Sequence, residues 1–281
     1  MAFTMRALAD PGPGYVTWQT GEPDYAGIYA PSPILAGTAV IASGPAFYYQ
    51  NQGKLGLDYA PVGLWLFDGD LTDDSGNGFD LTGAPLAYTD EATEWQRGAV
   101  TTGAASWTRV HEAALTITGA VTVEVVGSFQ SVATGNVVAT YIAGGELESA
   151  NCLYQVSFDS TGAMAMYWES GAGVDRVVVS PAGVIPRGLP VHLAWTRSAD
   201  AAADVNFYVN GVNVGSGSAL AATGGSLSTL YVGGASGGNY LPRLCVLSSL
   251  KIIAAELSAA QIEAEFNRTL GQRAPFWPRI V

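Results

Sequence analysis

The densest group of side chains that could bind a metal is a run of five aspartates, Asp68, Asp70, Asp73, Asp74 and Asp80. Calcium takes six to eight oxygen ligands, several of them from carboxylates. Asp70, Thr72 and Asp74 follow the spacing of the first EF-hand ligands, but position 12 of that loop is Leu81, which excludes an EF-hand. A loop site built on Asp74 and Asn77 stays open. The preferred interpretation is a solvated turn, in which such side chains satisfy backbone donors without an ion, so no cofactor is expected.

The sequence offers little for covalent or acid–base catalysis. His111 and His192 are its only histidines, and both lie in strand-like stretches without a Gly-x-Ser-x-Gly nucleophile motif. We expect both to be hydrogen-bonded or surface histidines. Cys152 and Cys245 are too few for a disulfide framework or a cysteine-rich zinc site. Buried thiols are expected, with a single bridge as the alternative.

Charge excludes two classes of partner. Twelve Lys and Arg against 24 Asp and Glu give a net charge of −12, which repels the phosphate backbone of nucleic acids. No basic run is present to bind an anionic membrane surface, and no apolar run approaches the ~20 residues of a membrane span. The first residues, from Met1 to Pro11, lack the apolar stretch of a signal peptide, so none is predicted.

From Pro61 onward, the sequence predicts that the elements that position these side chains are strands. Low charge (13%), 35 glycines and many β-branched and aromatic residues favour an all-β protein. Val121, Val123 and Val125 alternate as on one face of a strand. Asn210-Gly211, between two alternating runs, predicts a tight two-residue hairpin. Strands that recur with turns between them indicate a two-sheet antiparallel sandwich.

One short helix is predicted near the C-terminus. Ser258 and Gln261 have the spacing of a capping box, in which each side chain bonds to a backbone N–H near the other. Leu257 and Ile262 flank it as a hydrophobic staple, and Gly271 is expected to end the helix.

The two ends of the chain differ from the middle. Residues 1–60 hold six of the 14 prolines and are rich in aromatics, and only six charges fall among them. Proline restricts the chain before docking, and large rings with polar tips are enriched at interface cores. We therefore expect an extended arm that contacts other subunits, with arm strands added to the chain's own sandwich as the alternative. The expected contact residues are Tyr15, Trp18, Tyr25, Tyr29, Tyr48 and Tyr49, with Phe276 and Trp277 of the C-terminal tail, 271–281.

Five motifs in order resemble the laminin-G-like branch of the concanavalin A-like lectin and glucanase fold. They are Leu64-Trp-Leu-Phe-Asp68 with Asp74-Ser-Gly-Asn-Gly78, Gly188-Leu-Pro-Val-His-Leu-Ala194, Phe207-Tyr-Val-Asn-Gly211, Leu230-Tyr-Val-Gly-Gly234, and Leu250-Lys-Ile252 with Leu257-Ser258. The resemblance covers residues 61–270 and implies a jelly-roll domain, with residues 1–60 and 271–281 outside it.

Two features of the family are missing from the sequence. Relatives that bind calcium through the opening turn use an acidic pair before the closing strand, where this chain has Ser248-Ser249. Glucanases of this fold carry Glu-x-Asp-x-Glu on one strand, which places the acid and the nucleophile on the same side. Glu146-Leu-Glu148 comes nearest but lacks the third acid, so no catalytic residue is assigned.

The resemblance leaves two functional hypotheses. The first is a non-enzymatic structural or interaction protein of a large assembly, a bacteriophage virion component on the outer surface (capsid decoration, tail or fibre) that forms homo-oligomers. Laminin-G-like domains occur among such proteins, and an acidic surface fits a place away from packaged nucleic acid. The second is a glycan-binding module or adhesin of a bacterial surface system. Trp107, Trp168 and Tyr240 could supply aromatic faces for a sugar, although most aromatics in a sandwich lie in its core.

Overall fold

The computed structural model describes the chain from residue 60 to 271 in segments, and two short strands before that. The described ranges are 15–16, 39–40, 60–67, 69–83, 88–89, 98–101, 106–129, 136–142, 152–169, 175–200, 202–220, 229–234, 241 and 245–271. The chain divides into two compact units, Met1–Gly56 and Leu57–Val281. In the first unit, β1 (Tyr15–Val16) pairs antiparallel with β2 (Ala39–Val40).

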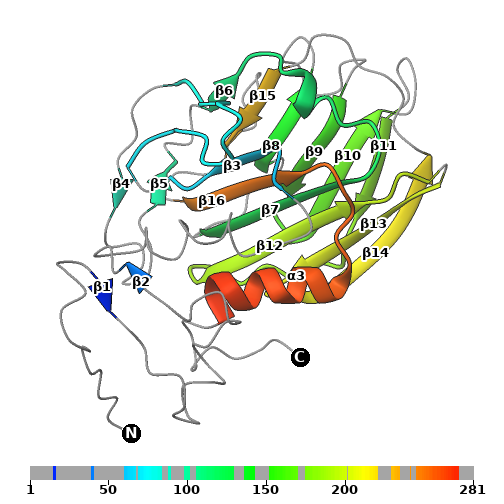
Figure 1. The fold of residues 1–281 in the computed structure, drawn as a ribbon. Coiled ribbons are helices and arrows are strands. Elements are labelled where there is room, and N and C mark those ends of the chain that lie inside the picture. Colours follow the sequence, from blue (N-terminus) through cyan, green and yellow to red (C-terminus); the bar gives the residue numbers. More distant parts are fainter. Residues whose placement is uncertain are drawn as a thin grey trace, which may run out of the picture. The chain divides into compact units, whose positions relative to one another are not determined.

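The second unit contains two antiparallel sheets that face each other across one core (Figure 1). The six-stranded sheet has the order β11-β10-β9-β8-β15-β6. Its strands are β6 (Trp107–Arg109), β8 (Asn136–Ile142), β9 (Cys152–Phe158), β10 (Met164–Glu169), β11 (Asp175–Val179) and β15 (Thr229–Val232).

The larger sheet has the order β14-β13-β12-β7-β16-β5-β4, and β3 pairs with β16 beside that path. Its strands are β3 (Gly63–Trp65), β4 (Tyr88–Thr89), β5 (Gly98–Val100), β7 (Val121–Ser128), β12 (Pro190–Arg197), β13 (Ala202–Val209), β14 (Val212–Leu220) and β16 (Val246–Ile253). Hairpin neighbours alternate with pairs that are distant in sequence, such as β7 beside β12 and β16, or β15 between β6 and β8, as in a jelly roll. The predicted all-β, two-sheet sandwich is confirmed.

The core lies between the sheets and follows the predicted alternation. Val121, Val123 and Val125 of β7 are fully buried, and Met166 and Trp168 of β10 face them from the other sheet. Cys152 and Cys245 are buried thiols that form no disulfide, which confirms the first of the two interpretations.

A buried arginine ties the end of the core together, and sequence patterns did not indicate it. Arg197 is fully buried and donates to the carbonyl oxygens of Leu153 (2.7 Å), Ile117 (3.2 Å) and Gly119 (2.9 Å). Its guanidinium lies 5.3 Å from the ring centroid of Trp168. Burial lowers the pKa of Arg197 to about 10, which still leaves it charged at neutral pH.

The hairpin and the helix form as the sequence predicts. Asn210 and Gly211 both have positive φ (50° and 79°), as the tight hairpin turn between β13 and β14 requires. Helix α3 (Ala259–Phe266) begins at Ser258, whose capping box with Gln261 is complete, and a π-helical turn (Asn267–Gly271) follows it. A 3₁₀ turn, η3 (Ala113–Leu115), precedes β7.

Helix α3 covers the outer face of the larger sheet, which sequence analysis did not predict (Figure 1). Leu257 and Ile262, the expected staple, pack there against Ala194, Tyr208 and Ile253. The side of the sheet that alternation alone assigns to solvent is therefore partly a second core.

The turn at Gly211 supports this helix, which gives a stability prediction. A Cβ at Gly211 would lie 3.2 Å from Glu263 Cα and from Phe266 Cβ, in a backbone region that side chains rarely adopt. Gly183 has a similar φ (+75°) with nothing near the added Cβ, so Gly183→Ala measures the backbone strain alone, about 1 kcal/mol. Gly211→Ala should cost about 2 kcal/mol or more in urea unfolding, because the helix must also shift. Equal losses in the two variants would contradict a tight contact between turn and helix.

Candidate functional site

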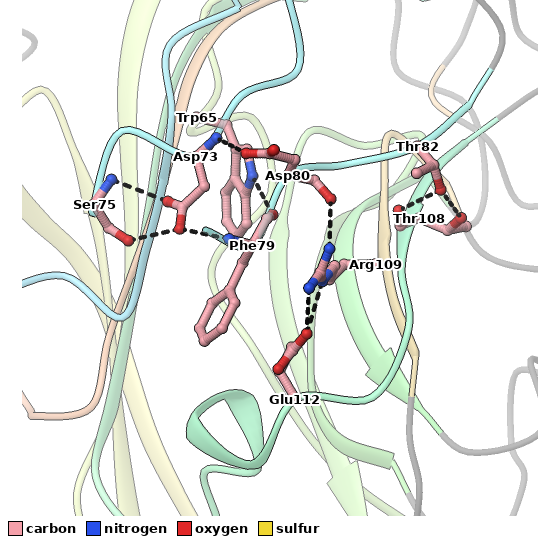
Figure 2. A network of polar contacts seen from close by, with 9 residues as sticks. All are labelled: Trp65, Asp73, Ser75, Phe79, Asp80, Thr82, Thr108, Arg109 and Glu112. Atoms are coloured by element: carbon pink, nitrogen blue, oxygen red, sulfur yellow. Dashed lines mark hydrogen bonds and ion pairs between the residues drawn. The ribbon is translucent and has the colours of Figure 1, made fainter. Parts of the chain in front are cut away.

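The opening turn after β3 is organised by one buried aspartate, Asp73 (Figure 2). Its Oδ1 accepts from the backbone N–H groups of Leu64 and Ser75, both at 3.0 Å. Its Oδ2 accepts from Ser75 Oγ (2.7 Å) and from the Phe79 N–H (2.9 Å). Both carboxylate oxygens therefore serve donors of the turn itself.

The residues proposed as metal ligands lie at the rim of this turn. Asp74 and Asn77 are exposed, and Asn77 Nδ2 donates to the carbonyl oxygen of Val62 (2.8 Å). Ser248 and Ser249, at the place of the family's closing acidic pair, are buried in β16. Among the described ranges, no three acidic, histidine or cysteine residues are placed to share a metal ion. The sequence does contain a sign of the role of Asp73, which is Ser75 two residues later. This spacing is typical of a turn in which the aspartate accepts hydrogen bonds from the chain, and not of a set of metal ligands.

This arrangement predicts that the domain folds without calcium. Asp73 is saturated by hydrogen bonds from the chain, so an ion at the turn would have few carboxylates to offset its dehydration. Millimolar calcium, or a chelator, should leave the melting temperature within about 1 °C. A rise of several degrees that chelator reverses would contradict this prediction.

A second set of contacts connects the opening turn to the six-stranded sheet (Figure 2). Arg109 of β6 pairs with Glu112, donates to the carbonyl oxygen of Asp80 (3.4 Å), and lies 5.9 Å from the ring centroid of Phe79. Thr82 donates to the carbonyl oxygen of Thr108 at 3.0 Å. These contacts hold the turn against the edge strand β6.

From Thr108, one line of residues crosses the outer face of the six-stranded sheet. Strand register places Thr108 beside Tyr231, and then Thr140, Gln155, Tyr167 and Val177. Leu230, Val156 and Met166, which neighbour Tyr231, Gln155 and Tyr167 along their strands, belong to the core, so these three residues lie on the outer face of the sheet. We call these six residues the outward row.

The outward row combines rings with polar groups. Tyr167 and Tyr231 are partly exposed, whereas Gln155 is only 9% exposed and its Oε1 has no hydrogen-bond partner. Glu169, two residues after Tyr167 on the same face of β10, is buried as well. The exposed parts of this face are therefore the tyrosine rings, whereas Gln155 Oε1 and Glu169 Oε1 are closed to solvent.

A cluster of four charged side chains lies between the larger sheet and helix α3. Lys251 Nζ lies 3.0 Å from Glu124 Oε2 and 2.7 Å from Glu265 Oε2, and Arg268 pairs with Glu265. Burial raises the pKa of Glu124 even though Lys251 opposes the shift. Burial would lower the pKa of Lys251, but Glu124 and Glu265 outweigh it and raise that pKa above its usual range. These groups hold the helix on the sheet and are closed to a substrate.

The histidine beside this cluster was predicted incorrectly. His192 is 1% exposed, and neither of its ring nitrogens has a hydrogen-bond partner, so it is neither a surface nor a hydrogen-bonded imidazole. Burial, reinforced by Lys251, lowers its pKa to about 3. The ring is therefore neutral at neutral pH and packs near Phe266 (ring centroids 6.2 Å apart).

The structure reassigns two of the aromatic residues considered for sugar binding. Trp107 and Trp168 are 3% and 0% exposed and belong to the core between the sheets, so neither offers a face to a ligand. Tyr240 lies outside the described residues, as do Trp18, Tyr25, Tyr29, Tyr48, Tyr49, Phe276 and Trp277. Tyr15 is described only through the backbone of β1. The contact role of these residues stays a prediction.

Similar folds occur in several solved structures. Domain 4 of AbnA, a GH43 extracellular arabinanase from Geobacillus stearothermophilus solved in complex with arabinotriose, is 20% identical, with a TM-score of 0.55. The alignment covers 74% of this chain and 98% of that domain. The binding domain of Paraclostridial Mosquitocidal Protein 1 is 13% identical, with a TM-score of 0.58, and 75% of this chain covers 52% of it.

A third example is the Ruminococcus gnavus IT-sialidase CBM40 bound to alpha2,3 sialyllactose. It is 11% identical, with a TM-score of 0.50, and the match covers 60% of this chain and 95% of that one. The chain spans about half the length of the toxin binding domains that it matches. At these identities the likeness establishes the fold.

No helix in the parts of the chain described above is long and apolar enough to cross a membrane.

Comparison by sequence gives the family. No curated protein matches the chain. The family profile of the concanavalin A-like lectin/glucanases superfamily matches residues 101–263, more than half of the chain and most of both sheets. The chain belongs to the concanavalin A-like lectin/glucanases superfamily.

Proposed function

We propose that this chain is a non-enzymatic interaction protein of a large assembly, a bacteriophage virion component whose jelly-roll domain lies on the outer surface. The observation that carries the non-enzymatic assignment is the use of the acidic groups in structure. Asp73 caps the opening turn, Glu112 pairs with Arg109, and Glu124 and Glu265 enclose Lys251. The engagement of these four carboxylates within the chain supports a structural use of its acidic groups rather than the paired acid and nucleophile of a glycosidase.

Placement in a virion rests on the ends of the chain and on its charge. Residues 1–56 form a unit of their own, and within it β1 pairs with β2. A separate aromatic and proline-rich unit is suited to hold neighbouring subunits. The net charge of −12 favours a position away from packaged nucleic acid.

Removal of residues 1–55 tests this role. The truncated protein should stay folded and soluble, with the melting transition of the jelly roll, but should no longer co-sediment with particles or form the native oligomer. If the protein without residues 1–55 is insoluble, an arm that completes its own sandwich is supported; if it assembles normally, the proposal is refuted.

Removal of the tail from Phe276 onward is a second test. It should weaken assembly more than it lowers the stability of the domain.

A second candidate function, glycan binding, is favoured by the outward row. Its partly exposed tyrosines and buried amide form the kind of surface that recognises a polyhydroxylated ligand. Domains of the same fold have been solved with arabinotriose and with sialyllactose. A glycan array separates the two functions, because a subunit that only contacts protein gives no specific signal on it.

A further inference from the structure

The sequence contains two Asn-Gly pairs, and the structure places them in opposite surroundings. Asn77-Gly78 lies in the exposed opening turn, whereas Asn210-Gly211 forms the hairpin turn that packs against helix α3. An asparagine followed by glycine can lose its side-chain ammonia without an enzyme, because glycine has no Cβ to keep its nitrogen away from the asparagine side chain. Asparagine is for this reason among the thermolabile residues of proteins. The surroundings of each pair therefore decide which one reacts.

Asn77-Gly78 has the freedom that this reaction needs. Both residues are exposed, and a Cβ added to Gly78 would meet nothing within 4 Å. Among the described residues, no group accepts a hydrogen bond from the Gly78 N–H, which holds the attacking nitrogen. The Asn77 side chain is held by a bond of 2.8 Å from Nδ2 to the carbonyl oxygen of Val62. Exchange of that bond for water leaves the side chain free to bring Cγ onto the Gly78 nitrogen.

Asn210-Gly211 lacks this freedom. Asn210 Oδ1 accepts from the backbone N–H of His192 (3.0 Å), and the Asn210 N–H donates to the carbonyl oxygen of His192 (2.8 Å). A Cβ at Gly211 would lie 3.2 Å from Phe266 Cβ, so helix α3 packs directly on the turn. This pair reacts only after the hairpin opens, and its rate is reduced to the fraction of molecules that are open.

We propose that Asn77-Gly78 is a site of spontaneous deamidation whose product loosens the opening turn. The Gly78 nitrogen forms a bond to Asn77 Cγ and gives up its proton, while the Cγ–Nδ2 bond breaks and ammonia leaves with that proton. Water then adds to the succinimide ring and opens it, which leaves a carboxylate in aspartate or isoaspartate. That carboxylate has no N–H for the carbonyl oxygen of Val62 and meets it as a second acceptor. The turn loses this bond, and the chain gains one negative charge.

Mass spectrometry of digests of the full chain, sampled during incubation at neutral and mildly alkaline pH, tests the site. In the folded protein, conversion at Asn77 should be at least about tenfold faster than at Asn210. It should be faster at the higher pH, because the attacking nitrogen must lose its proton. In urea, which removes the difference in surroundings, the two pairs should react at similar rates. Asn213 is the control for exposure alone, since it is exposed but precedes the branched Val214, and it should stay unconverted.

Two variants separate the reaction from its consequence. Asn77→Gln keeps an amide but places it one carbon further from the backbone, so conversion at this position should fall to background. Asn77→Asp carries the charge of the product and should melt about 2 °C lower than the wild type. The shift is small because Ser75 Oγ still donates to the carbonyl oxygen of Val62 (3.3 Å). If Asn77→Asp melted at the wild-type temperature, the loosening of the turn would be wrong.

The remaining outcomes bear on the site itself. Equal rates at Asn77 and Asn210 in the folded protein would overturn the selection of one pair by the fold. If the chain in urea converted at Asn77 and the folded chain did not, the turn would be closed to the reaction, and the proposed site would be refuted.

Discussion

Replacement of Lys251 by methionine is expected to cost about 3–5 kcal/mol of folding free energy at neutral pH. The ammonium lies between Glu124 and Glu265, whose side chains are 4% and 0% exposed. Methionine fills a similar volume, but among the described residues it leaves the two buried carboxylates with Arg268, which pairs with the other oxygen of Glu265, as their one cation. Chemical denaturation at pH 7 measures the loss.

The destabilisation should depend on pH in a defined direction. Burial raises the folded-state pKa of Glu124 above its ordinary value of 4.5 even with Lys251 present, and loss of Lys251 removes the main group that lowers that pKa. A carboxyl whose pKa is raised by folding favours the protonated native state, so its penalty is full above the folded pKa and disappears as the pH falls toward the unfolded value. The difference between wild type and Lys251→Met should therefore shrink between pH 7 and about pH 4.5.

Arg109→Met is the matched control for this experiment. Its ion pair with Glu112 joins side chains that are 26% and 24% exposed, where solvent screens the charges. The expected loss is at most about 1 kcal/mol. If Lys251→Met were no worse than Arg109→Met, helix α3 would not depend on the buried pairs.

Asp73→Ala is expected to destabilise the domain by about 3 kcal/mol, the second large effect. The carboxylate accepts from the backbone N–H groups of Leu64, Ser75 and Phe79, and the first of these is buried. Each buried donor left unpaired costs about 1–3 kcal/mol. Asp73→Asn keeps the shape and one acceptor oxygen, so its loss should be intermediate.

The neighbouring aspartate separates this effect from general loss of charge. Asp74 is exposed, so Asp74→Ala should stay within about 0.5 kcal/mol in the same thermal or urea unfolding experiment. A loss as large as that of Asp73→Ala would mean that the exposed carboxylate carries the turn, as it would in a metal site.

The elements that the sequence predicted correctly have local causes. Asn210-Gly211 forms its hairpin because both residues tolerate positive φ, and α3 begins at Ser258 because the capping box lies within four residues. The buried valines of β7 follow from a period of two. Order and spacing of such motifs also carried the family resemblance, and with it the jelly roll.

Sequence analysis missed the residues whose burial depends on another element that covers their strand. Alternation places Glu124, His192 and Lys251 on the outer face of the larger sheet, where they would normally meet solvent. Helix α3 covers that face, so Glu124 and His192 are buried and the side chain of Lys251 is only 12% exposed; the charged residues therefore need each other.

The sequence by itself determined the fold class, the hairpin, the capped helix and the family, because periodicity, turn residues and caps act over a few positions. The tertiary structure alone decided which outward faces are covered, which aspartate holds the opening turn, and which residues form the outward row. That row crosses the consecutive strands β8 to β11 and then β15 and β6, so that Thr108 lies beside Tyr231, 123 positions later in the chain. Partners this far apart are fixed by strand register and packing, which no local pattern encodes.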